Sequence, residues 1–307
     1  MKILFVCSGN SGSANPFVKE QAAQLQSAGM DVSIFLIKGK GALGYLRNLP
    51  AYRAAIQSFK PDVVHAHGGM SALLAALQRI VPVVVTFHGS DVNVPSLRKL
   101  ARLSVLLTKH QIVVSQQMKN LLNNPLVYVI PCAVEPTIFQ PMDYDSCRRQ
   151  LKWLPEEFVV LFSSSFDRPV KNAPLARQAV EGITIQQVRL VELKGKSREE
   201  VAMLLNACDV ALMTSYTEGS PQFIKEAMAC GTPIVSTRVG DVPELIEGLP
   251  GHYLIDYDAR LVGESILRAV EYRREYRLTG AREILEKRGL FPPHVVNALV
   301  EVYTSCL

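Results

Sequence analysis

The feature that most constrains this 307-residue sequence is a repeated alternation of short apolar runs with longer helical stretches. The first series runs from KILFVC through DVSIFLI, DVVHAH, PVVVTFHG and QIVVS to VYVIP. The second begins at FVVLFSSS and continues through VRLVEL, DVALMTS, PIVST and HYLID. Almost wholly apolar runs separated by helices are typical of buried parallel strands that helices cover on both faces. We therefore predict an α/β fold with two doubly wound parallel-sheet domains.

The chain length is consistent with two domains, because single cores stop growing at about 250–300 residues. We place the domains at residues 1–135 and 136–290, with a Pro- and Phe-containing linker near 131–141. Residues 291–307 are predicted to form a final helix, with an apolar stripe that includes Val296, Leu299 and Tyr303. Two such domains are expected to form a cleft at the carboxyl ends of their strands, where ligands bind in open α/β sheets.

Two loops of the first domain contain residues suited to binding. The loop after the first strand has Gly9 and Gly12, and it is open to two interpretations: a phosphate or sugar contact through backbone amides, or a plain tight turn. It lacks a third glycine, and no acidic residue follows the second strand, which argues against dinucleotide binding. His88 follows the run PVVVTF and should emerge at a strand end, where Gly89 would let a ligand approach. We favour a functional role for His88 over a structural one.

The neighbouring polar residues of this domain are interpreted differently. Asp91 can orient His88 or cap a helix. His67 is expected near a strand end and His65 within the strand, and we predict structural roles for both. The six cysteines have no CxxC spacing, so we predict reduced core cysteines rather than a zinc or redox site.

A loop of the second domain has two cations three residues apart, Arg168 and Lys171. The loop follows a strand and enters a helix. Arginine can donate to two oxygens at once and lysine adds a point charge, so the pair suits a diphosphate. The alternative is a solvated surface loop.

The most informative stretch runs from Glu218 through the next helix. Ser220 is predicted as the N-cap and Pro221 as the first helical residue, with the helix ending at Gly231. Free amides near residues 219–222 should attract an anion, and Glu218 and Glu226 could accept hydrogen bonds from sugar hydroxyl groups. The alternative gives Glu226 to a salt bridge and Glu218 to the surface.

The stretch Glu218 to Glu226 has the pattern E-x7-E within EGSPQFIKEAMACGTPIVST, followed by VGDVPELI. It resembles the signature of the retaining family 4 glycosyltransferases, which have the GT-B fold of two Rossmann-like domains. The resemblance covers nearly the whole chain and includes MKILFV, HAHGG, FHGSD and VIPCAVEPTIFQP. It implies an acceptor-side first domain, a second domain that binds a nucleotide sugar, and a final helix that packs back on the first.

The resemblance also implies roles for individual residues. Glu226 would bind the donor ribose, and Glu218 would contact the transferred sugar together with the backbone at Gly219 and Ser220. Arg168 and Lys171 would neutralise the diphosphate as the leaving group forms. Gly9 and Gly12 would face the diphosphate, and His88 would lie beside the sugar as a catalytic residue. The resemblance implies no metal or other cofactor.

Charge is distributed unevenly along the chain. Residues 1–135 have 13 Lys+Arg and 5 Asp+Glu, a net of +8, while the remainder has 20 and 23, a net of −3. A basic first domain favours an anionic partner, such as a phosphorylated acceptor or an acidic membrane. Residues 96–103 mix bases with leucines and could lie on an anionic bilayer, or form an ordinary amphipathic helix. The bases lack interleaved aromatic residues, which argues against nucleic-acid binding.

We therefore predict an enzyme that transfers a hexose-type sugar from a UDP-sugar, or less favourably a GDP-sugar, to a glycan or lipid-linked acceptor. A nucleotide-sugar epimerase and a non-catalytic sugar-nucleotide binding protein are the alternatives. The apolar run at the N-terminus is too short for a signal-peptide core, so the expected location is the cytosol, with possible contact at the inner face of the membrane.

Overall fold

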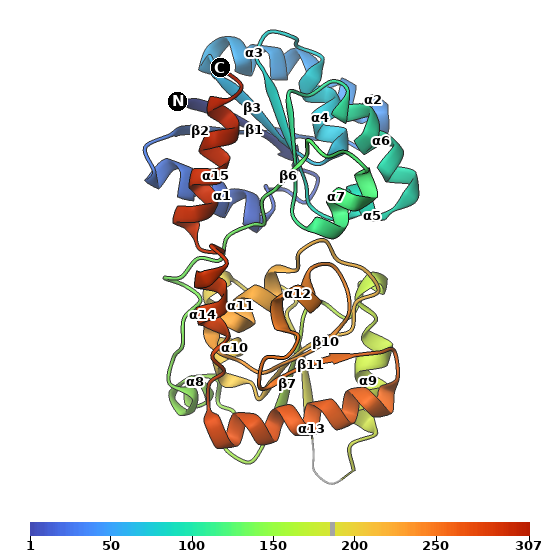
Figure 1. Ribbon diagram of the computed structural model, residues 1–307, viewed down its shortest axis with the longest axis vertical. Helices are drawn as coiled ribbons and strands as arrows, with labels where there is room; N and C mark the ends of the chain where they lie inside the picture. The colour runs from blue at the N-terminus through green and yellow to red at the C-terminus, as the bar shows by residue number, and fades with distance from the viewer. Residues whose placement is uncertain (185–187) are drawn as a thin grey trace. The chain divides into compact units, whose positions relative to one another are not determined.

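The computed structural model describes residues 1–184 and 188–307, and the chain divides into two compact units (Figure 1). Unit 1 comprises Met1–Ala133 and Pro292–Leu307, and unit 2 comprises Val134–Phe291. Within the described residues, no helix is both long enough and apolar enough to cross a membrane.

Unit 1 is built on a six-stranded parallel sheet with the order β2-β1-β3-β4-β5-β6. Its strands are β1 (Lys2–Ser8), β2 (Asp31–Ile37), β3 (Val63–His67), β4 (Val83–Phe87), β5 (His110–Val113) and β6 (Tyr128–Val129). Its helices are α1 (Pro16–Ser27), α2 (Gly41–Leu46), α3 (Leu49–Phe59), α4 (Gly69–Ala76), α5 (Ser90–Asn93), α6 (Pro95–Val105), α7 (Gln116–Leu122) and α15 (Pro292–Thr304).

The two faces of this sheet are covered by different helices, because side chains of a strand alternate between faces. In β1, Leu4 and Val6 pack in a core with α3 and α4, while Ile3 and Phe5 pack with α1 and the C-terminal helix α15. Helix α15 thus belongs to unit 1 although it follows all of unit 2 in the sequence, and Figure 1 shows it beside α1.

Unit 2 repeats the architecture with a five-stranded parallel sheet of order β11-β10-β9-β7-β8. Its strands are β7 (Phe158–Phe162), β8 (Val188–Glu192), β9 (Val210–Met213), β10 (Ile234–Thr237) and β11 (His252–Ile255). Its helices are α8 (Tyr144–Leu151), η1 (Pro169–Lys171), α9 (Ala173–Glu181), α10 (Arg198–Ala207), α11 (Gln222–Cys230), α12 (Val242–Ile246), α13 (Ala259–Tyr276) and α14 (Ala281–Lys287). The predicted pair of doubly wound, parallel-sheet domains is confirmed.

Each sheet contains one point where the strand order reverses. In unit 1 the chain leaves β1 for β2 on one side and places β3 on the other, and in unit 2 the same happens at β7 with β8 and β9. The loops that follow strands on either side of such a reversal separate and leave a crevice, which is where open α/β sheets bind ligands.

Candidate active site

In unit 2 the reversal point brings together the two loops that the sequence singles out. The amide of Tyr216, after β9, donates to the carbonyl of Val170, after β7, at 2.9 Å. The hydroxyl of Thr214 donates to the carbonyl of Lys171 at 3.0 Å. These bonds fix the loop with the two predicted cations against the loop with Glu218.

Lys171 and Glu218 form an ion pair with Nζ 2.6 Å from Oε1, and their side chains are only 13% and 16% exposed. Glu218 is therefore not a free surface carboxylate, and the Lys171 ammonium is already held by a counter-charge. Arg168 precedes η1 with an exposed side chain, and the described part of the chain gives its guanidinium no ion pair. The two cations are thus close in sequence but differ in setting.

The start of α11 differs by one residue from the prediction. Pro221, with extended ψ of 117°, is the N-cap in place of Ser220, and the helix begins at Gln222. Proline can cap because its fixed φ suits this position, but it has no side-chain oxygen that could accept from the helix amides, and no side-chain cap is present here. At the other end Gly231 has φ +70°, the left-handed cap that was predicted.

The uncapped start leaves backbone donors available. Among the described residues, the amides of Gly219, Ser220 and Phe223 have no hydrogen-bond partner. Unsatisfied amides at a helix N-terminus, together with the helix dipole, favour an anion there.

Glu226 lies on α11 with its side chain only 3% exposed, and its Oε1 accepts from Arg198 Nη2 at 2.7 Å. The Arg198 guanidinium also stacks over the Phe139 ring, 4.5 Å from its centroid. The salt-bridge interpretation therefore describes Glu226 in this structure. Arg198 was missed from the sequence, because it begins α10 and its partner Glu226 lies 28 residues later on another helix.

A third loop supports the backbone beside Glu218. Gly240, after β10, has φ +58°, and a Cβ on it would lie 2.6 Å from the carbonyl oxygen of Gly219. Only glycine fits this approach. The next residue, Asp241, is buried near the fully buried Lys225 on α11. Burial raises the pKa of Asp241, and the Lys225 charge opposes that rise. Neither residue was predicted, since their approach brings together two different elements.

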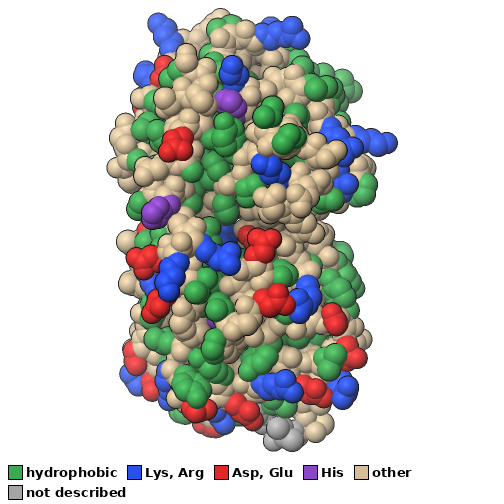
Figure 2. Space-filling model, viewed as in Figure 1, with side chains coloured by type: hydrophobic (Ala, Val, Ile, Leu, Met, Phe, Trp, Pro, Cys, Tyr) green, Lys and Arg blue, Asp and Glu red, His purple; other side chains and the backbone are tan. Residues whose placement is uncertain are grey.

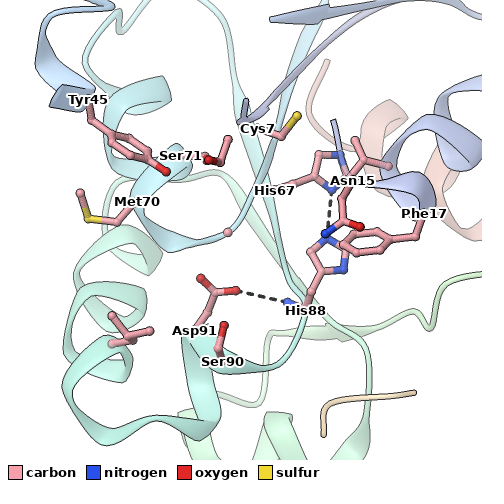
Figure 3. A pocket seen from close by; sticks show the side chains of 14 residues that line it. Cys7, Asn15, Phe17, Tyr45, His67, Met70, Ser71, His88, Ser90 and Asp91 are labelled. Atoms are coloured by element: carbon pink, nitrogen blue, oxygen red, sulfur yellow. Dashed lines mark hydrogen bonds between the residues drawn. The ribbon is translucent and has the colours of Figure 1, made fainter. Parts of the chain in front are cut away.

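Unit 1 has a pocket of about 340 Å³ at its own reversal point. Small-molecule sites occupy roughly 300–1,000 Å³. Figure 3 shows Tyr45 and Met70 on one side, Asn15, Phe17 and His88 on the other, and Ser90 and Asp91 below. The full lining is Cys7, Ser8, Asn15, Phe17, Val18, Tyr45, His67, Gly68, Met70, Ser71, His88, Ser90, Asp91 and Leu97.

His88 lies directly after β4 and lines this pocket, as its position in the sequence suggested. Its Nε2 is 3.0 Å from Nδ1 of His67, so one ring donates to the other. Its Nδ1 is 3.8 Å from the sulfur of Cys132, and its ring packs against Phe17. Contacts on both nitrogens and on the ring face fix the orientation of His88.

The other two predicted histidines are buried in β3. His65 contacts the Tyr303 hydroxyl at 2.6 Å and Thr86 Oγ1 at 2.7 Å. Burial, with a smaller contribution from His88, lowers the pKa of His65 to about 3. Burial lowers the pKa of His67 well below its usual value, so His67 is neutral. The structural role predicted for His65 fits these contacts, whereas His67 also lines the pocket.

Asp91 joins the loops after β3 and β4. Its Oδ1 accepts from the amide of Gly69 at 3.0 Å. Its Oδ2 accepts from the amide of His88 at 3.4 Å, as the dashed line in Figure 3 shows. Gly69 is the first residue of α4, so the carboxylate caps that helix. Of the two alternatives raised for Asp91, capping is realised, and its bond to His88 is to the backbone amide and not to the ring.

Gly9 and Gly12 do not line the pocket. The Gly9 amide donates to the carbonyl of Ile37 at 2.8 Å, and the Gly12 amide donates to the carbonyl of Gly9 at 3.0 Å. Gly12 has φ +90° and a Cβ on Gly9 would lie 2.8 Å from Leu36. Of the two open interpretations, the tight turn describes these two glycines, and a ligand contact by this loop stays a prediction.

Other chemistry considered from the sequence has no counterpart in residues 1–184 and 188–307. No group of three or more His, Cys, Asp or Glu side chains there could hold a metal ion. All six cysteines are free thiols in this structure, and five of them are buried.

Two family models match this chain. Residues 17–137 match the model described as "Glycosyltransferase Family 4", and residues 167–271 match "Glycosyl transferases group 1". The chain belongs to glycosyltransferase family 4.

Among curated relatives of this glycosyltransferase, a D-inositol 3-phosphate glycosyltransferase of Mycobacterium marinum is 24% identical, over 82% of this chain and 72% of that protein. The N-acetyl-alpha-D-glucosaminyl L-malate synthase of Bacillus anthracis is 23% identical, over 72% of this chain and 68% of its own length.

Solved structures show the same fold at low identity. A sucrose-phosphate synthase of Thermosynechococcus elongatus superposes with a TM-score of 0.83 and 18% identity, over 99% of this chain and 98% of that one. Anabaena HepE in complex with UDP-glucose has a TM-score of 0.77 and 18% identity, over 99% and 100% of the two chains. The fold of the glycosyltransferase is therefore GT-B. A UDP-GlcNAc 2-epimerase of Methanocaldococcus jannaschii has a TM-score of 0.63, so the fold alone does not separate the two enzyme classes.

Proposed function

We propose that this glycosyltransferase transfers a hexose-type sugar from a nucleotide-diphosphate sugar to a glycan or lipid-linked acceptor, with retention of anomeric configuration. The observation that carries the proposal is the start of α11, where uncapped amides are flanked by Glu218 and Glu226 with Lys171 alongside. UDP is favoured over GDP, in line with the UDP and UDP-glucose complexes of HepE.

Each side chain of the unit 2 site has a proposed partner on the donor. The amides at Gly219 and Ser220 and the charges of Arg168 and Lys171 bind the diphosphate. Glu218 accepts from hydroxyl groups of the transferred sugar. Glu226 accepts from the ribose hydroxyls, with Arg198 holding its carboxylate in place. The diphosphate would bind Lys171 and the sugar would bind Glu218, each in competition with the ion pair between these two residues. We therefore expect donor binding to rearrange this pair.

The proposed reaction is a same-face displacement. The acceptor oxygen forms a bond to the anomeric carbon while the bond from that carbon to the leaving phosphate oxygen breaks, and its electron pair goes to the phosphate. The leaving phosphate takes the acceptor proton, so the nucleoside diphosphate and the glycoside are the two products. Arg168 and Lys171 stabilise the charge that develops on the diphosphate. For unit 1 we propose that His88 contacts the reacting groups, and that the Gly9–Gly12 loop contributes to nucleotide-sugar binding.

A thermal-shift screen of nucleotides and nucleotide sugars tests the donor assignment. Ligand binding stabilises the native state by RT ln(1 + [L]/Kd), about 2.7 kcal/mol at one hundred times Kd. We expect stabilisation by UDP and by at least one UDP-sugar, and less by GDP. No stabilisation by any nucleoside diphosphate would refute the proposal. Incubation of the stabilising sugar nucleotide without acceptor separates transfer from epimerisation, because only an epimerase would convert it to a second sugar nucleotide.

We also propose that catalysis needs no metal or other cofactor, since two cations of unit 2 already lie beside the expected diphosphate. Excess EDTA should change the transfer rate by less than twofold. Loss of activity in EDTA that added Mg²⁺ or Mn²⁺ restores would contradict this.

The surface of α6 supports contact with an anionic membrane. This helix exposes Leu103, and Leu106 and Leu107 follow with 80% and 44% exposure, beside the bases Lys99 and Arg102. Figure 2 shows Lys and Arg side chains gathered with hydrophobic ones on the part of unit 1 where Figure 1 places α6. Leucines flanked by bases fit the boundary of an acidic bilayer.

Vesicle pelleting tests this surface. We expect binding to vesicles of phosphatidylglycerol and phosphatidylcholine, but not of phosphatidylcholine alone, and a severalfold loss in the variant Leu103→Ser, Leu106→Ser. The matched control is Leu278→Ser, an exposed leucine of unit 2. Failure to bind acidic vesicles even at low salt would rule the membrane contact out.

A further inference from the structure

The net charge of +8 in residues 1–135 favours an anionic acceptor, such as a phosphorylated sugar. The pocket of unit 1 indicates the opposite. None of the thirteen Lys and Arg residues of this region is among the fourteen described residues that line it. Asp91 is the only Asp or Glu among these lining residues, and His67 is held neutral by burial.

A phosphate could still bind without lysine or arginine if a helix N-terminus were available, since its amides attract anions. Helix α4 begins at the pocket, but its Gly69 amide already donates to Asp91 Oδ1 at 3.0 Å. The other oxygen of the same carboxylate accepts from the amide of His88. The first amide of α4 is thus taken by a carboxylate of the protein, which would repel an incoming anion.

Helix α1 also begins at the pocket and offers little more. Pro16 has no N–H, and the amides of Val18 and Lys19 both donate to the carbonyl of Asn15, at 3.0 and 3.2 Å. This leaves Phe17 as the donor of the first turn. Backbone amides in the first turns of α1 and α4 offer donors but no cation that would offset the repulsion between a phosphate and the nearby carboxylate of Asp91.

The same lining is suited to an uncharged ligand rich in hydroxyl groups. The Asp91 carboxylate can accept, and the Asn15 amide and the hydroxyls of Ser8, Ser71 and Ser90 can donate. The rings of Phe17 and Tyr45 provide flat apolar surface at opposite sides (Figure 3). Donors and acceptors around aromatic faces match a sugar ring, which has hydroxyl groups at its rim and C–H groups on its faces.

We propose that this pocket binds the acceptor and that the group it takes is a neutral, polyhydroxylated ring rather than a phosphorylated or carboxylated one. That the ligand is an acceptor rests on the proposed glycosyl transfer, whereas the chemical class of the ligand follows from the residues that line the pocket. The basic residues of unit 1 then act outside the pocket, at the protein surface.

Matched probe pairs test the ligand class with the full chain. One set is methyl glucoside, methyl galactoside, methyl mannoside and myo-inositol, and the other is the 6-phosphates of the same sugars and inositol 1-phosphate. Binding is measured by saturation-transfer NMR without donor, and acceptor use by release of nucleoside diphosphate from the donor found in the thermal-shift screen. We expect at least one neutral probe to bind at least tenfold more tightly than its phosphorylated partner.

A charge-reversal variant sharpens the test. Met70→Lys places an ammonium at the pocket, replacing one long, partly exposed side chain with another. It should strengthen binding of the phosphorylated probes at least fivefold. Ile80→Lys adds the same charge at an exposed position of unit 1 that does not line the pocket, and should change nothing.

The results separate the two proposals. Equal or tighter binding of the phosphorylated probes, or binding of none of the neutral probes at millimolar concentration, would overturn the ligand class. Absence of any nucleotide-induced stabilisation would instead overturn glycosyl transfer, and the NMR comparison would still decide what the pocket binds.

Discussion

The two units share a parallel-sheet architecture, but in each of them the net charge differs in character from the charged residues found at the candidate site. The first 135 residues have a net charge of +8, yet no Lys or Arg is among the described residues that line the unit 1 pocket. The rest of the chain has a net charge of −3, yet its candidate site gathers Lys171, Arg198 and the buried Lys225. Net charge therefore predicts neither the sign of a site nor its ligand.

The physical reason lies in how the two scales of charge act. Summed surface charge shapes the long-range field and the solubility of a domain. A charge in a pocket, by contrast, is desolvated and must have a partner, which limits it to positions that the fold supplies with one. In unit 2, carboxylates on a loop and on α11 hold Lys171 and Arg198, whereas in unit 1 backbone amides hold the only carboxylate among the described residues of the pocket.

The largest expected difference between the units appears on acidification. His65 has a pKa of about 3 and His67 one well below its usual value, both in unit 1, whereas unit 2 has His252 with a pKa of about 4; burial is the main cause in each case. The unfolded chain binds these protons near pH 6.5 and the native state does not. Stability therefore falls as pH drops below about 6.5, by roughly 1.4 kcal/mol per pH unit for each histidine. Unit 1, with two such histidines, should unfold at the higher pH.

The single tryptophan makes this measurable. Trp153 lies in unit 2, so its fluorescence reports that unit, while far-ultraviolet circular dichroism reports both. We expect the dichroism to begin to fall at a higher pH than the fluorescence change. His65→Gln, which can keep hydrogen bonds to Tyr303 and Thr86, should bring the two onsets closer. If the two signals changed at the same pH in the wild type and in the His65→Gln variant, the buried histidines would not make unit 1 the more acid-sensitive unit.

The next largest effect is expected at Glu226. Hydrogen bonds to a charged group contribute about 1.5–3 kcal/mol each, and each 1.36 kcal/mol is tenfold in rate. Glu226→Gln should thus lower kcat/KM for the sugar nucleotide about a hundredfold, mostly through KM, with unchanged circular dichroism. Glu244→Gln, an exposed carboxylate on α12, is the control and should stay within twofold. Normal kinetics in the Glu226→Gln variant would mean that Glu226 does not bind the donor and serves only in its ion pair with Arg198.

The Lys171–Glu218 pair gives a smaller effect that distinguishes binding from support. If Lys171 contacts the diphosphate, Lys171→Met should weaken UDP binding about tenfold by calorimetry. If Glu218 contacts the sugar, Glu218→Gln should weaken binding of the UDP-sugar and leave UDP unchanged. The contrary result is that each single variant weakens the binding of UDP and of the UDP-sugar equally, with no further loss in the double variant. That result would mean that the ion pair acts only as a unit that holds the two loops together.

How much of this was predictable depends on whether a residue's neighbours are local in sequence. The alternation of apolar runs predicted both sheets, and the strand-end position of His88 placed it at the pocket. The turn at Gly9 and the Arg198–Glu226 pair were not decided in advance, because their partners, Ile37 and an arginine 28 residues before Glu226, lie on other elements. The same holds for Asp91, whose capping of α4 crosses 22 residues and determines the character of the pocket.

The helix start at Pro221 illustrates a second limit. In a Ser-Pro sequence at a helix start, either the serine or the proline can be the N-cap, and local propensity does not decide between them. The outcome matters, because the proline cap leaves α11 without a side-chain hydrogen bond at the position where a diphosphate is expected.

Arg168 should give the smallest effect of the unit 2 site, and it tests whether exposed and enclosed cations differ there. Its side chain is exposed, so its attraction to a diphosphate is screened by solvent and salt, unlike that of the largely buried Lys171. Arg168→Gln should weaken UDP binding by about two- to fivefold at low salt, and the difference from wild type should vanish near 0.5 M NaCl. Arg260→Gln, an exposed arginine on α13, should have no effect at either salt concentration. A tenfold or salt-insensitive loss for Arg168→Gln would mean that donor binding buries this arginine, and the contrast with Lys171 would not hold.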